Sequence, residues 1–468
     1  MLNAAEFIVD NENPNCNDSL GNPFCKISTA LKKAIPDTTI NISAGLYLEN
    51  ILIDKNITLL SMNNGVVTIN GMQKSHVVLI EPGIKASIIG LHLINGKASN
   101  GGGILNNGEL TIENVNIENN IALLSGGGIY NARSISGNLI IRNARISHNS
   151  ALGDDKYNVK YGGGGISNEA PLEIFQSEIN HNFAKDNGGG IYSVFSGRRH
   201  ASAGQIAAEK LGISSAPDRM KSLTRKSDSN SVKIINTKIM NNVAEAGGGV
   251  NVHGVLNMEN SLVDSNQAIN GSRSAGGGIF GHFDTALILT NTIISHNIAT
   301  FRGGGLRFYS TNFGQLFNVS IVDNHVLERF GGGAGLYLVK GTKRFEMKNS
   351  LIVNNQKNEI TSNCLGTINS NGYNVISKNQ KCQFVKTKGD QELNNKKSKK
   401  LYRWDDAHKS YSVIANAYTI DTADPDGCKG EGGKLIKQDI YAHDRHIDAV
   451  GDGKKRCDIG AIEYVAGF

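Results

Sequence analysis

Apolar residues recur two positions apart in short runs along most of the chain, and polar residues fill the positions between them. One run follows the pattern L-x-I-x-N-x-x-I-x-x-N-x-A at residues 110–122, and further copies begin at Leu139 and Leu287. Alternation with period two is typical of a short strand with one buried face. The asparagines interrupt the strands, because asparagine side chains cap turns and tolerate left-handed backbone. Each copy therefore predicts three short strands separated by two turns.

Runs of three glycines followed by an aliphatic residue mark the same part of the chain. A single run would suit a loop that cradles a phosphate. Eight runs at intervals of 25 to 59 residues indicate a repeat architecture instead. The glycines would then form corners at which a coil bends tightly and neighbouring backbones approach each other. The runs begin at Gly101, Gly126, Gly163, Gly188, Gly247, Gly276, Gly303 and, in degenerate form, Gly333.

Two columns of amide side chains recur in phase with the strands. Stacked one coil apart, at about 4.8 Å, such amides can hydrogen bond to one another in a ladder. Because an unpaired buried amide costs about 1–3 kcal/mol, we assign these residues a structural role and not a catalytic one. The first column is Asn114, Asn143, Gln176, Asn236, Asn260, Asn291, Asn318 and Asn349, and the second is Asn120, Asn149, Asn182, Asn242, Asn266, Asn297, Asn324 and Asn355.

These patterns predict an all-β protein, a parallel β-helix of about eleven coils with asparagine ladders. We expect an N-terminal cap at residues 1–38, with a short amphipathic helix at 28–34. The β-helix would occupy residues 39–355, with insertions near 151–161 and 197–230. A loop-rich region stapled by disulfides would follow at 356–468.

Six cysteines form three local pairs, and no zinc-site spacing accompanies them. We predict the disulfides Cys16–Cys25, Cys364–Cys382 and Cys428–Cys457, and hence an oxidising compartment. Six reduced thiols are the alternative. The first residues, MLNAAEFIVD, show no signal peptide, so removal of a leader and another export route both stay open. No apolar stretch is long enough for a transmembrane span. The formal charge of +6 is mild for 468 residues and indicates at most a preference for anionic partners.

Several segments resemble known families. The GGGI and I-x-x-N words resemble repeats of chlamydial polymorphic outer-membrane proteins, and residues 22–60 resemble the first coils of exported pectate-lyase-like proteins. The words GTINSNGYNVISKNQKCQF, TIDTADPDGC and CDIGAIEY resemble the end of choice-of-anchor Q surface proteins. The resemblance implies a right-handed parallel β-helix that is exported and often attached to the cell surface, and it implies no particular activity. Residues 439–445 differ from the family's DQRG-like segment, so attachment and release both stay open.

The residue after each aliphatic forms a further column, Leu105, Tyr130, Ser167, Tyr192, Asn251, Phe280, Arg307 and Tyr337. If the aliphatic points inward, its successor points outward. We expect an exposed stripe that binds a glycan through Tyr130, Tyr192, Asn251, Phe280, Arg307 and Tyr337. The alternative is that these rings only cover the coil or pack beneath inserted loops.

Two residues further on, three coils offer His253, His282 and Tyr309, with Asp284 nearby. Together with Arg302 and Arg307 they form a candidate catalytic set for uronate chemistry, in which an arginine neutralises the carboxylate and histidine or tyrosine moves protons. The alternative is a stack of polar surface residues. We expect no metal in this set.

Two further features concern ligands. The aspartates of the C-terminal region offer oxygen ligands for calcium, although no calcium-loop spacing is met, and we otherwise expect no cofactor. They are Asp421, Asp424, Asp426, Asp439, Asp444, Asp448 and Asp452. The insertion at 197–230 has seven basic and three acidic residues, so it either clamps an anionic polymer or is a tolerated loop.

Three functional hypotheses follow. The first is a secreted or surface-exposed, adhesin-like protein that binds a polysaccharide or glycoconjugate, possibly acidic. The second is a polysaccharide lyase or glycoside hydrolase that acts along the β-helix. The third is a structural spacer on the cell surface. We expect a monomer, and no nucleic-acid partner, because no aromatic and basic residues interleave.

Overall fold

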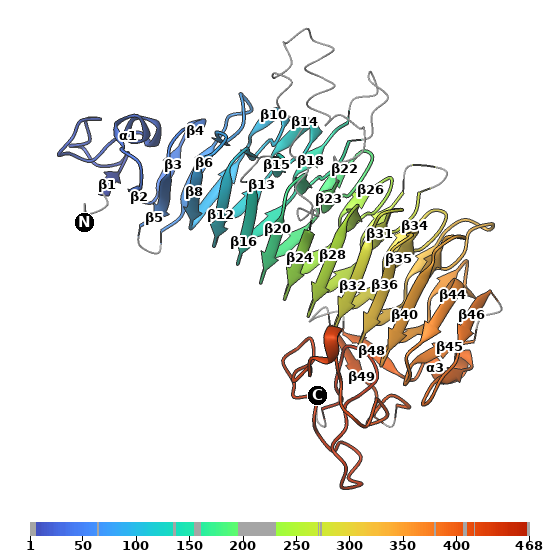
Figure 1. Ribbon diagram of the computed structural model, residues 1–468. Helices are drawn as coiled ribbons and strands as arrows, with labels where there is room; N and C mark the ends of the chain where they lie inside the picture. Colours follow the sequence, from blue (N-terminus) through green and yellow to red (C-terminus); the bar gives the residue numbers. More distant parts are fainter. Residues whose placement is uncertain are drawn as a thin grey trace. The chain divides into compact units, whose positions relative to one another are not determined.

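The computed structural model describes residues 6–62, 65–133, 137–153, 161–194, 231–269, 271, 274–378, 381–405, 410–415 and 417–465. The chain divides into two compact units, Met1–Val232 and Lys233–Phe468. Within each unit the strands of successive coils pair in parallel, which makes each a right-handed parallel β-helix, as predicted (Figure 1). The insertion at 197–230 and most of that near 151–161 lie outside the described residues.

In unit 1 the coils supply strands to four parallel stacks, numbered here in chain order, and stack 3 begins only with β10. Stack 1 contains β1 (Glu6–Val9), β2 (Thr38–Ile42), β5 (Ile57–Ser61), β8 (Lys85–Ile89), β12 (Glu109–Glu113), β16 (Asn138–Arg142) and β20 (Leu172–Phe175). Stack 2 contains β3 (Gly45–Tyr47), β6 (Val67–Asn70), β9 (Leu91–Ile94), β13 (Asn116–Glu118), β17 (Arg145–Ser147) and β21 (Glu178–Asn180). Stack 3 contains β10 (Lys97–Asn100), β14 (Ile121–Ser125), β18 (Ser150–Ala151) and β22 (Phe183–Ala184). Stack 4 contains β4 (Ile51–Ile53), β7 (Val78–Ile80), β11 (Ile104–Asn106), β15 (Ile129–Asn131), β19 (Ile166–Asn168) and β23 (Ile191–Ser193).

Unit 2 has the same arrangement. Stack 1 contains β24 (Ser231–Ile235), β28 (Val255–Glu259), β32 (Ala286–Thr290), β36 (Phe313–Phe317), β40 (Arg344–Lys348) and β46 (Cys382–Val385). Stack 2 contains β25 (Lys238–Met240), β29 (Leu262–Asp264), β33 (Ile293–Ser295), β37 (Ser320–Val322), β41 (Leu351–Val353), β45 (Val375–Ser377) and β47 (Gln391–Leu393). Stack 3 contains β26 (Val243–Ala244), β30 (Gln267–Ala268), β34 (Ile298–Ala299), β38 (His325–Val326), β42 (Gln356–Lys357) and the antiparallel β43 (Ile360–Thr361). Stack 4 contains β27 (Val250–Val252), β31 (Ile279–Gly281), β35 (Leu306–Phe308) and β39 (Leu336–Leu338). The long strand β44 (Cys364–Ser370) pairs with both β39 and β40.

The core of each coil consists of the inward-pointing aliphatic residues. Ile112 pairs in register with Ile141 in stack 1, and Ile117 pairs with Ile146 in stack 2. All four side chains are fully buried. Because one residue of each coil lies directly over its counterpart in the next, an in-phase sequence repeat becomes a continuous apolar column.

The second amide column forms the predicted ladder. Asn297 Nδ2 donates to Asn324 Oδ1 at 2.9 Å and to the Val263 carbonyl at 2.8 Å, while its own Oδ1 accepts from Asn266 Nδ2 at 3.0 Å. In the first column, the described residues form only one hydrogen bond between side chains, from Asn291 Nδ2 to Asn260 Oδ1 at 2.6 Å. The first column instead supplies left-handed turn residues, such as Asn291 at φ +49°. The ladder predicted there was largely wrong, because the residue serves the backbone of a turn.

The glycine runs form the predicted corners between stacks 3 and 4. Gly126 has φ +71°, and a Cβ at Gly127 would lie 2.5 Å from the carbonyl oxygen of Gly164 on the next coil. The first position therefore requires glycine because its backbone is left-handed, and the second requires glycine because two coils approach closely there.

The cap and the three disulfides agree with the sequence. Helix α1 (Ile27–Lys33) buries Ile27, Ala30 and Leu31. The three predicted cysteine pairs are bonded. Parallel pairing also includes β1 and β44 to β47, which lie outside residues 39–355. The three-part division of the chain stays a prediction. No helix of the described ranges is long and apolar enough to cross a membrane.

The C-terminal segment, defined here as residues 401–465, covers the outer side of stack 2 in unit 2. It contains β48 (Tyr402–Asp405), the antiparallel β49 (Ser410–Val413) and the 3-10 helix η3 (Glu431–Gly433), and it follows the short helix α3 (Asn395–Ser398). Its apolar residues form one cluster with Leu262, Ile293 and Leu351 of the stack. The first amide column also fixes it, because Asn291 and Asn318 donate to carbonyl groups of the segment at 3.1 and 3.4 Å.

Candidate functional site

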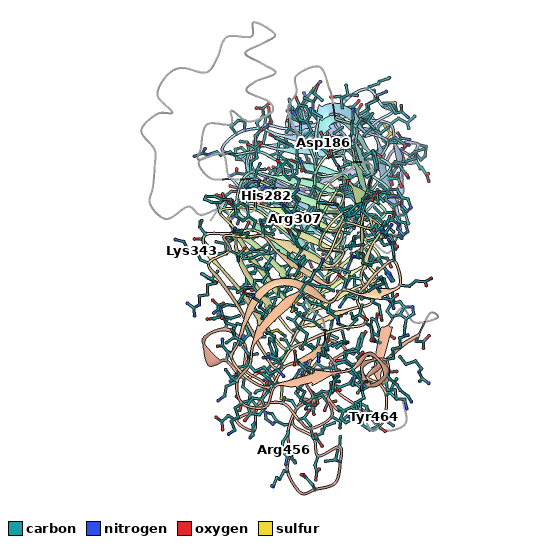
Figure 2. The ribbon with its side chains drawn as sticks, turned by 90° about the vertical axis from the view of Figure 1, so that its right-hand side faces the viewer. Asp186, His282, Arg307, Lys343, Arg456 and Tyr464 are labelled. Carbon is teal, nitrogen blue, oxygen red and sulfur yellow. A yellow bond between two sulfur atoms is a disulfide. The ribbon has the colours of Figure 1, made fainter. Side chains whose placement is uncertain are left out.

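The candidate site lies on the outer side of stack 4 in unit 2. Strands β27, β31, β35 and β39 place Asn251, Phe280, Arg307 and Tyr337 in one register, as the sequence predicted. Figure 2 marks His282 and Arg307, which belong to neighbouring coils. The ring of His282 stacks on that of His253.

The rings of this face stack on one another. The centroids of His253 and His282 are 3.8 Å apart, and those of His282 and Phe280 are 4.2 Å apart. The guanidinium carbon of Arg307 lies 4.0 Å from the centroid of Phe280. Coils about 4.8 Å apart bring flat side chains into face-to-face contact, so the rings present mainly their edges to a ligand.

This packing corrects the prediction of an exposed aromatic stripe. Phe280 is 9% exposed, Tyr337 is 7% exposed and Asn251 is fully buried, while Arg307 is half-buried. The side chains do point outward, but neighbouring side chains cover their faces. Their assignment as ligand-binding residues stays a prediction, and binding would have to use ring edges and polar atoms.

The unit 1 part of the column is also largely covered. Tyr130 is 6% exposed, and its hydroxyl donates to Glu169 Oε1 at 2.5 Å. Burial, and secondarily the Glu169 carboxylate, raises the pKa of Tyr130 well above its usual value. Burial likewise raises the pKa of Tyr192, which is half-buried. Sequence reasoning missed Glu169, although it lies two positions after the column residue Ser167, the same place in the coil as His253, His282 and Tyr309.

Asp284 and His253 form a hydrogen-bonded pair at the edge of the ring stack in unit 2. His253 Nδ1 lies 3.0 Å from Asp284 Oδ1, and the two side chains are 29% and 45% exposed. The hydrogen bond from His253 is the main reason that the pKa of Asp284 lies below its usual value. His253 therefore donates through Nδ1, and its Nε2 has no partner in the described part of the chain. A neutral His253 would present an accessible lone pair there.

His282 is held in the neutral form. Its Nε2 lies 2.8 Å from Asn251 Oδ1, and Asn251 uses its amide nitrogen on the Ala246 carbonyl, so His282 is the donor. Burial, followed by the charges of His253 and Arg307, lowers the pKa of His282 well below its usual value. His282 is thus a neutral spacer in the stack, with its Nε2 proton committed to Asn251.

Two arginines border the ring stack without a carboxylate partner among the described residues. Arg302 Nη1 donates to the Tyr337 hydroxyl at 2.7 Å, and its guanidinium carbon lies 4.4 Å from the Phe301 centroid. Burial lowers the pKa of Arg307 to about 10, which still leaves it charged at neutral pH. Burying a cation without a counter-ion is unfavourable, so this pair of guanidiniums favours an anionic ligand.

Tyr309 completes the predicted set on the coil after His282. It is half-buried, and its ring centroid lies 5.5 Å from that of Phe283. The structure thus gathers His253, His282, Asp284, Arg302, Arg307 and Tyr309 on one face of unit 2. The arrangement offers a cation for an anion at one end of the ring stack and a base, His253, at the other end.

The tail aspartates mainly support their own turns. Asp439 accepts from the backbone N–H of Tyr441 and His443, and Asp448 accepts from those of Asp452 and Gly453. No group of three or more histidine, cysteine, aspartate or glutamate side chains is placed to hold a metal in the described ranges. Calcium binding stays a prediction.

No family model and no curated protein sequence matches this chain. Among solved structures, it is similar to pectate lyase Pel9A, at 13% identity and a TM-score of 0.45, with 98% of this chain and 96% of that chain covered. It is also similar to the pectin methylesterase from Aspergillus niger, at 10% identity and a TM-score of 0.30, with 76% of this chain and 86% of that chain covered. The function of this chain has to be inferred from its own residues.

Proposed function

We propose that this protein is secreted or displayed on a cell surface and binds an acidic polysaccharide on the outer side of stack 4 in unit 2. The observation that carries the proposal is the pair of guanidiniums, Arg302 and Arg307, bordering a ring stack with no carboxylate partner in the described part of unit 2. Guanidinium groups match the geometry of carboxylates, so a uronate carboxylate is a suitable counter-ion.

The remaining contacts favour a hydroxyl-rich chain over a nucleic acid. Proteins that bind single-stranded nucleic acids stack bases on free aromatic faces. The ring of Phe280 is not free, because it already contacts the ring of His282 and the guanidinium of Arg307. The edges of His253, Tyr309 and Asp284 offer hydrogen-bond donors and acceptors, which sugar hydroxyls can use. Three disulfides support an oxidising compartment, where extracellular polysaccharides occur.

Calorimetric titration with an oligomer of galacturonate tests the proposal. Arg307→Ala should weaken binding by about tenfold or more, because a hydrogen bond to a charged group contributes about 1.5–3 kcal/mol. The affinity of Arg307→Lys should lie between those of the wild type and Arg307→Ala, since lysine keeps the charge but lacks the planar guanidinium. Binding should also weaken between about 0.05 M and about 0.5 M salt. Arg344→Ala is the matched control, because Arg344 is exposed on stack 1 and already pairs with Glu346 at 2.6 Å.

The proposal fails if the Arg307 and Arg344 variants bind equally well while both retain the unfolding midpoint of the wild type. Absence of binding to acidic and neutral glycans alike would favour the structural-spacer hypothesis.

The Asp284–His253 pair favours a second candidate, a polysaccharide lyase at the same face. An arginine would pair with the uronate carboxylate and acidify the adjacent C–H bond. Phe280 and His282 lie between Arg307 and His253 in the ring stack, so the side chains would have to turn toward each other for His253 Nε2 to take that proton. The electrons of the C–H bond would form a carbon–carbon double bond, and the glycosidic oxygen on the next carbon would leave and take a proton from water. Product formation would be followed by the ultraviolet absorbance of the unsaturated sugar. His253→Ala should abolish this signal with little loss of binding, whereas wild-type protein without turnover would exclude the lyase.

A further inference from the structure

A turn at residues 328–331 presents an exposed phenylalanine beside the candidate site. The Gly331 amide donates to the Glu328 carbonyl at 3.1 Å, which places Phe330 at the centre of the turn. The side chain of Phe330 is 84% exposed. Central turn positions usually carry glycine, proline, asparagine, aspartate or serine. Neither turn chemistry nor core packing therefore accounts for a phenylalanine here.

Backbone contacts fix this turn to the coil that carries Arg302. The Gly332 amide donates to the Phe301 carbonyl at 3.2 Å, and Gly332 pairs in parallel with Arg302. Arg302 in turn donates to the Tyr337 hydroxyl. The ring of Phe330 thus projects from a fixed backbone, at the edge of stack 4 where the strands begin and where Arg302 lies.

A turn at residues 282–285 presents a second phenylalanine at the edge of stack 4 where the strands end. The Thr285 amide donates to the His282 carbonyl at 3.0 Å, so Phe283 lies at the centre of this turn. Phe283 is 45% exposed. Its ring contacts that of Tyr309 at an interplanar angle of 58°, an inclined contact that leaves ring surface for a ligand.

The two turns are further apart than one sugar can reach. The parallel bridges Ala275–Arg302 and Arg302–Gly332 place Ala275, on the coil of β31, level with the first turn. Eight residues lead from Ala275 to Phe283, and they span at most about 26 Å when fully extended. Strand β31 itself lies between the two edges and is about 10 Å long. A ligand that contacts both phenylalanines is therefore an oligomer.

The surface between the two turns carries the cations of the site. Arg302 and Arg307 have no carboxylate partner among the residues that the structure describes. A sugar acid has a hydroxyl-poor ring face, which can pack on an aromatic ring, and a carboxylate, which can pair with a guanidinium. Single-stranded nucleic acid fits less well, because its successive bases stack on neighbouring rings. Phe330 and Phe283 lie at opposite edges of the stack.

We propose that the ligand is an acidic oligosaccharide that crosses stack 4 in the direction of its strands, from Phe330 to Phe283, and does not follow the coil axis. One sugar stacks on each phenylalanine, and carboxylates of the sugars between them pair with Arg302 and Arg307. This inference rests on the proposed polysaccharide binding at the two arginines. It makes the two phenylalanines specificity-determining residues, because they select sugars with a hydroxyl-poor face.

The test is calorimetric titration of the full-length protein with the hexamer and the dimer of galacturonate. Phe330→Ala and Phe283→Ala should each weaken hexamer binding by about fivefold, the usual size of one aromatic contact. The double variant should weaken it by about 25-fold, because the two rings contact separate sugars. The dimer cannot reach both rings, so its affinity should decrease by at most about fivefold in the double variant.

Matched variants separate ring stacking from apolar contact in general. Phe330→Trp should bind the hexamer like the wild type, whereas Phe330→Leu should lose as much as Phe330→Ala, because leucine is apolar but has no flat ring. Leu327→Ala is the control and should leave the affinity unchanged. Leu327 is 52% exposed, but it directly follows β38 in stack 3.

The outcomes distinguish this inference from the function on which it rests. If both alanine variants bind the hexamer as tightly as Leu327→Ala while Arg307→Ala loses binding, the crossing path is wrong and the arginine site stands. If Arg307→Ala also binds like the wild type, the proposed function itself is wrong. A double variant no weaker than either single variant would overturn the crossing path. Single-stranded oligothymidylate that binds more tightly than the hexamer, and weakens in Phe330→Ala, would assign the rings to base stacking.

Discussion

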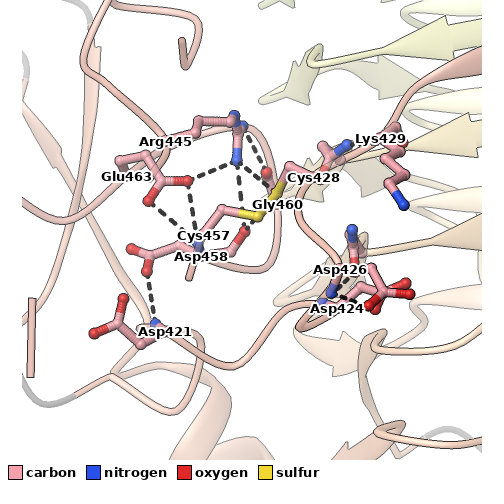
Figure 3. The surroundings of a disulfide bond; sticks show 12 residues. Asp421, Asp424, Asp426, Cys428, Lys429, Arg445, Cys457, Asp458, Gly460 and Glu463 are labelled. Atoms are coloured by element: carbon pink, nitrogen blue, oxygen red, sulfur yellow. Dashed lines mark hydrogen bonds and ion pairs between the residues drawn. A yellow bond between two sulfur atoms is a disulfide. The ribbon is translucent and has the colours of Figure 1, made fainter. Parts of the chain in front are cut away.

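Arg445→Met should loosen the C-terminal segment from the coils of unit 2, because Arg445 is fully buried at their contact. Its guanidinium donates to Glu463 Oε1 at 2.8 Å and to the Gly460 carbonyl at 2.9 Å (Figure 3). It also donates to the side-chain oxygen of Asn291 in the amide column. Methionine can fill part of the space but donates no hydrogen bond. The substitution therefore leaves the Glu463 carboxylate buried without its cation.

We expect Arg445→Met to lower the free energy of unfolding by about 4 kcal/mol. Removing one partner of a buried ion pair costs about 3–5 kcal/mol, because the other charge remains in a poorly solvated site. That is a large fraction of the roughly 5–15 kcal/mol by which folded proteins are stable. The double variant Arg445→Met/Glu463→Gln should recover part of the loss, since it removes the stranded charge.

The assay is urea unfolding followed by tryptophan fluorescence. Trp404 is the single tryptophan of the chain, and its ring centroid lies 4.5 Å from that of His296 on the coil. Its emission therefore reports whether the C-terminal segment is docked. Arg456→Met is the control, because Arg456 forms an exposed ion pair with Asp452 that contributes at most about 1 kcal/mol. Equal unfolding midpoints for the Arg445 and Arg456 variants would refute the reasoning.

Three further predictions concern stability. Asn297→Ala should lower the free energy of unfolding in urea by about 4 kcal/mol, because four hydrogen bonds of about 1 kcal/mol each are lost. The control is Asn257→Ala, on the outer side of stack 1, which should change this free energy little. Equal losses in the two variants would contradict the ladder. Burial raises the pKa of Asp458 to about 7, so the folded state holds a proton that the unfolded state releases. This contribution to stability should decrease as the pH rises from about 4 through about 7, and thermal midpoints across that range should be flatter in Asp458→Asn. Replacing Cys428 and Cys457 by serine should cost about 3.6 kcal/mol by the chain-entropy relation for a separation of 29 residues, and an unchanged unfolding midpoint under matched conditions would show that the bond adds no stability.

The repeated features of the fold were predictable from the sequence. The second amide column, the glycine corners and the inward aliphatic residues all recur in phase, and each follows from rules that act within one coil or between adjacent coils. The register of the column Asn251, Phe280, Arg307 and Tyr337 was predictable for the same reason. The local cysteine pairs were predictable because each closes a short segment, with separations of 9, 18 and 29 residues.

The covering of outward side chains could be recognised only in part. In unit 1 the outward residues of stack 2 include Asn116 and Arg145, which are exposed. The corresponding residues in unit 2, Leu262 and Ile293, are apolar and buried. That change signals that something covers the stack, but the sequence does not say which segment does.

The sequence alone thus determined the coil, its corners, its amide ladder and the residues that share each column, because a periodic pattern repeats the same short-range contacts. Only the tertiary structure decided what each outward column faces. It closed the aromatic faces by stacking His282 on Phe280, and it left Arg307 without a carboxylate partner among the described residues. The sequence places these residues in columns but does not say which side chain covers which. The energies of these contacts depend on which side chains meet in space, and no local pattern encodes that meeting.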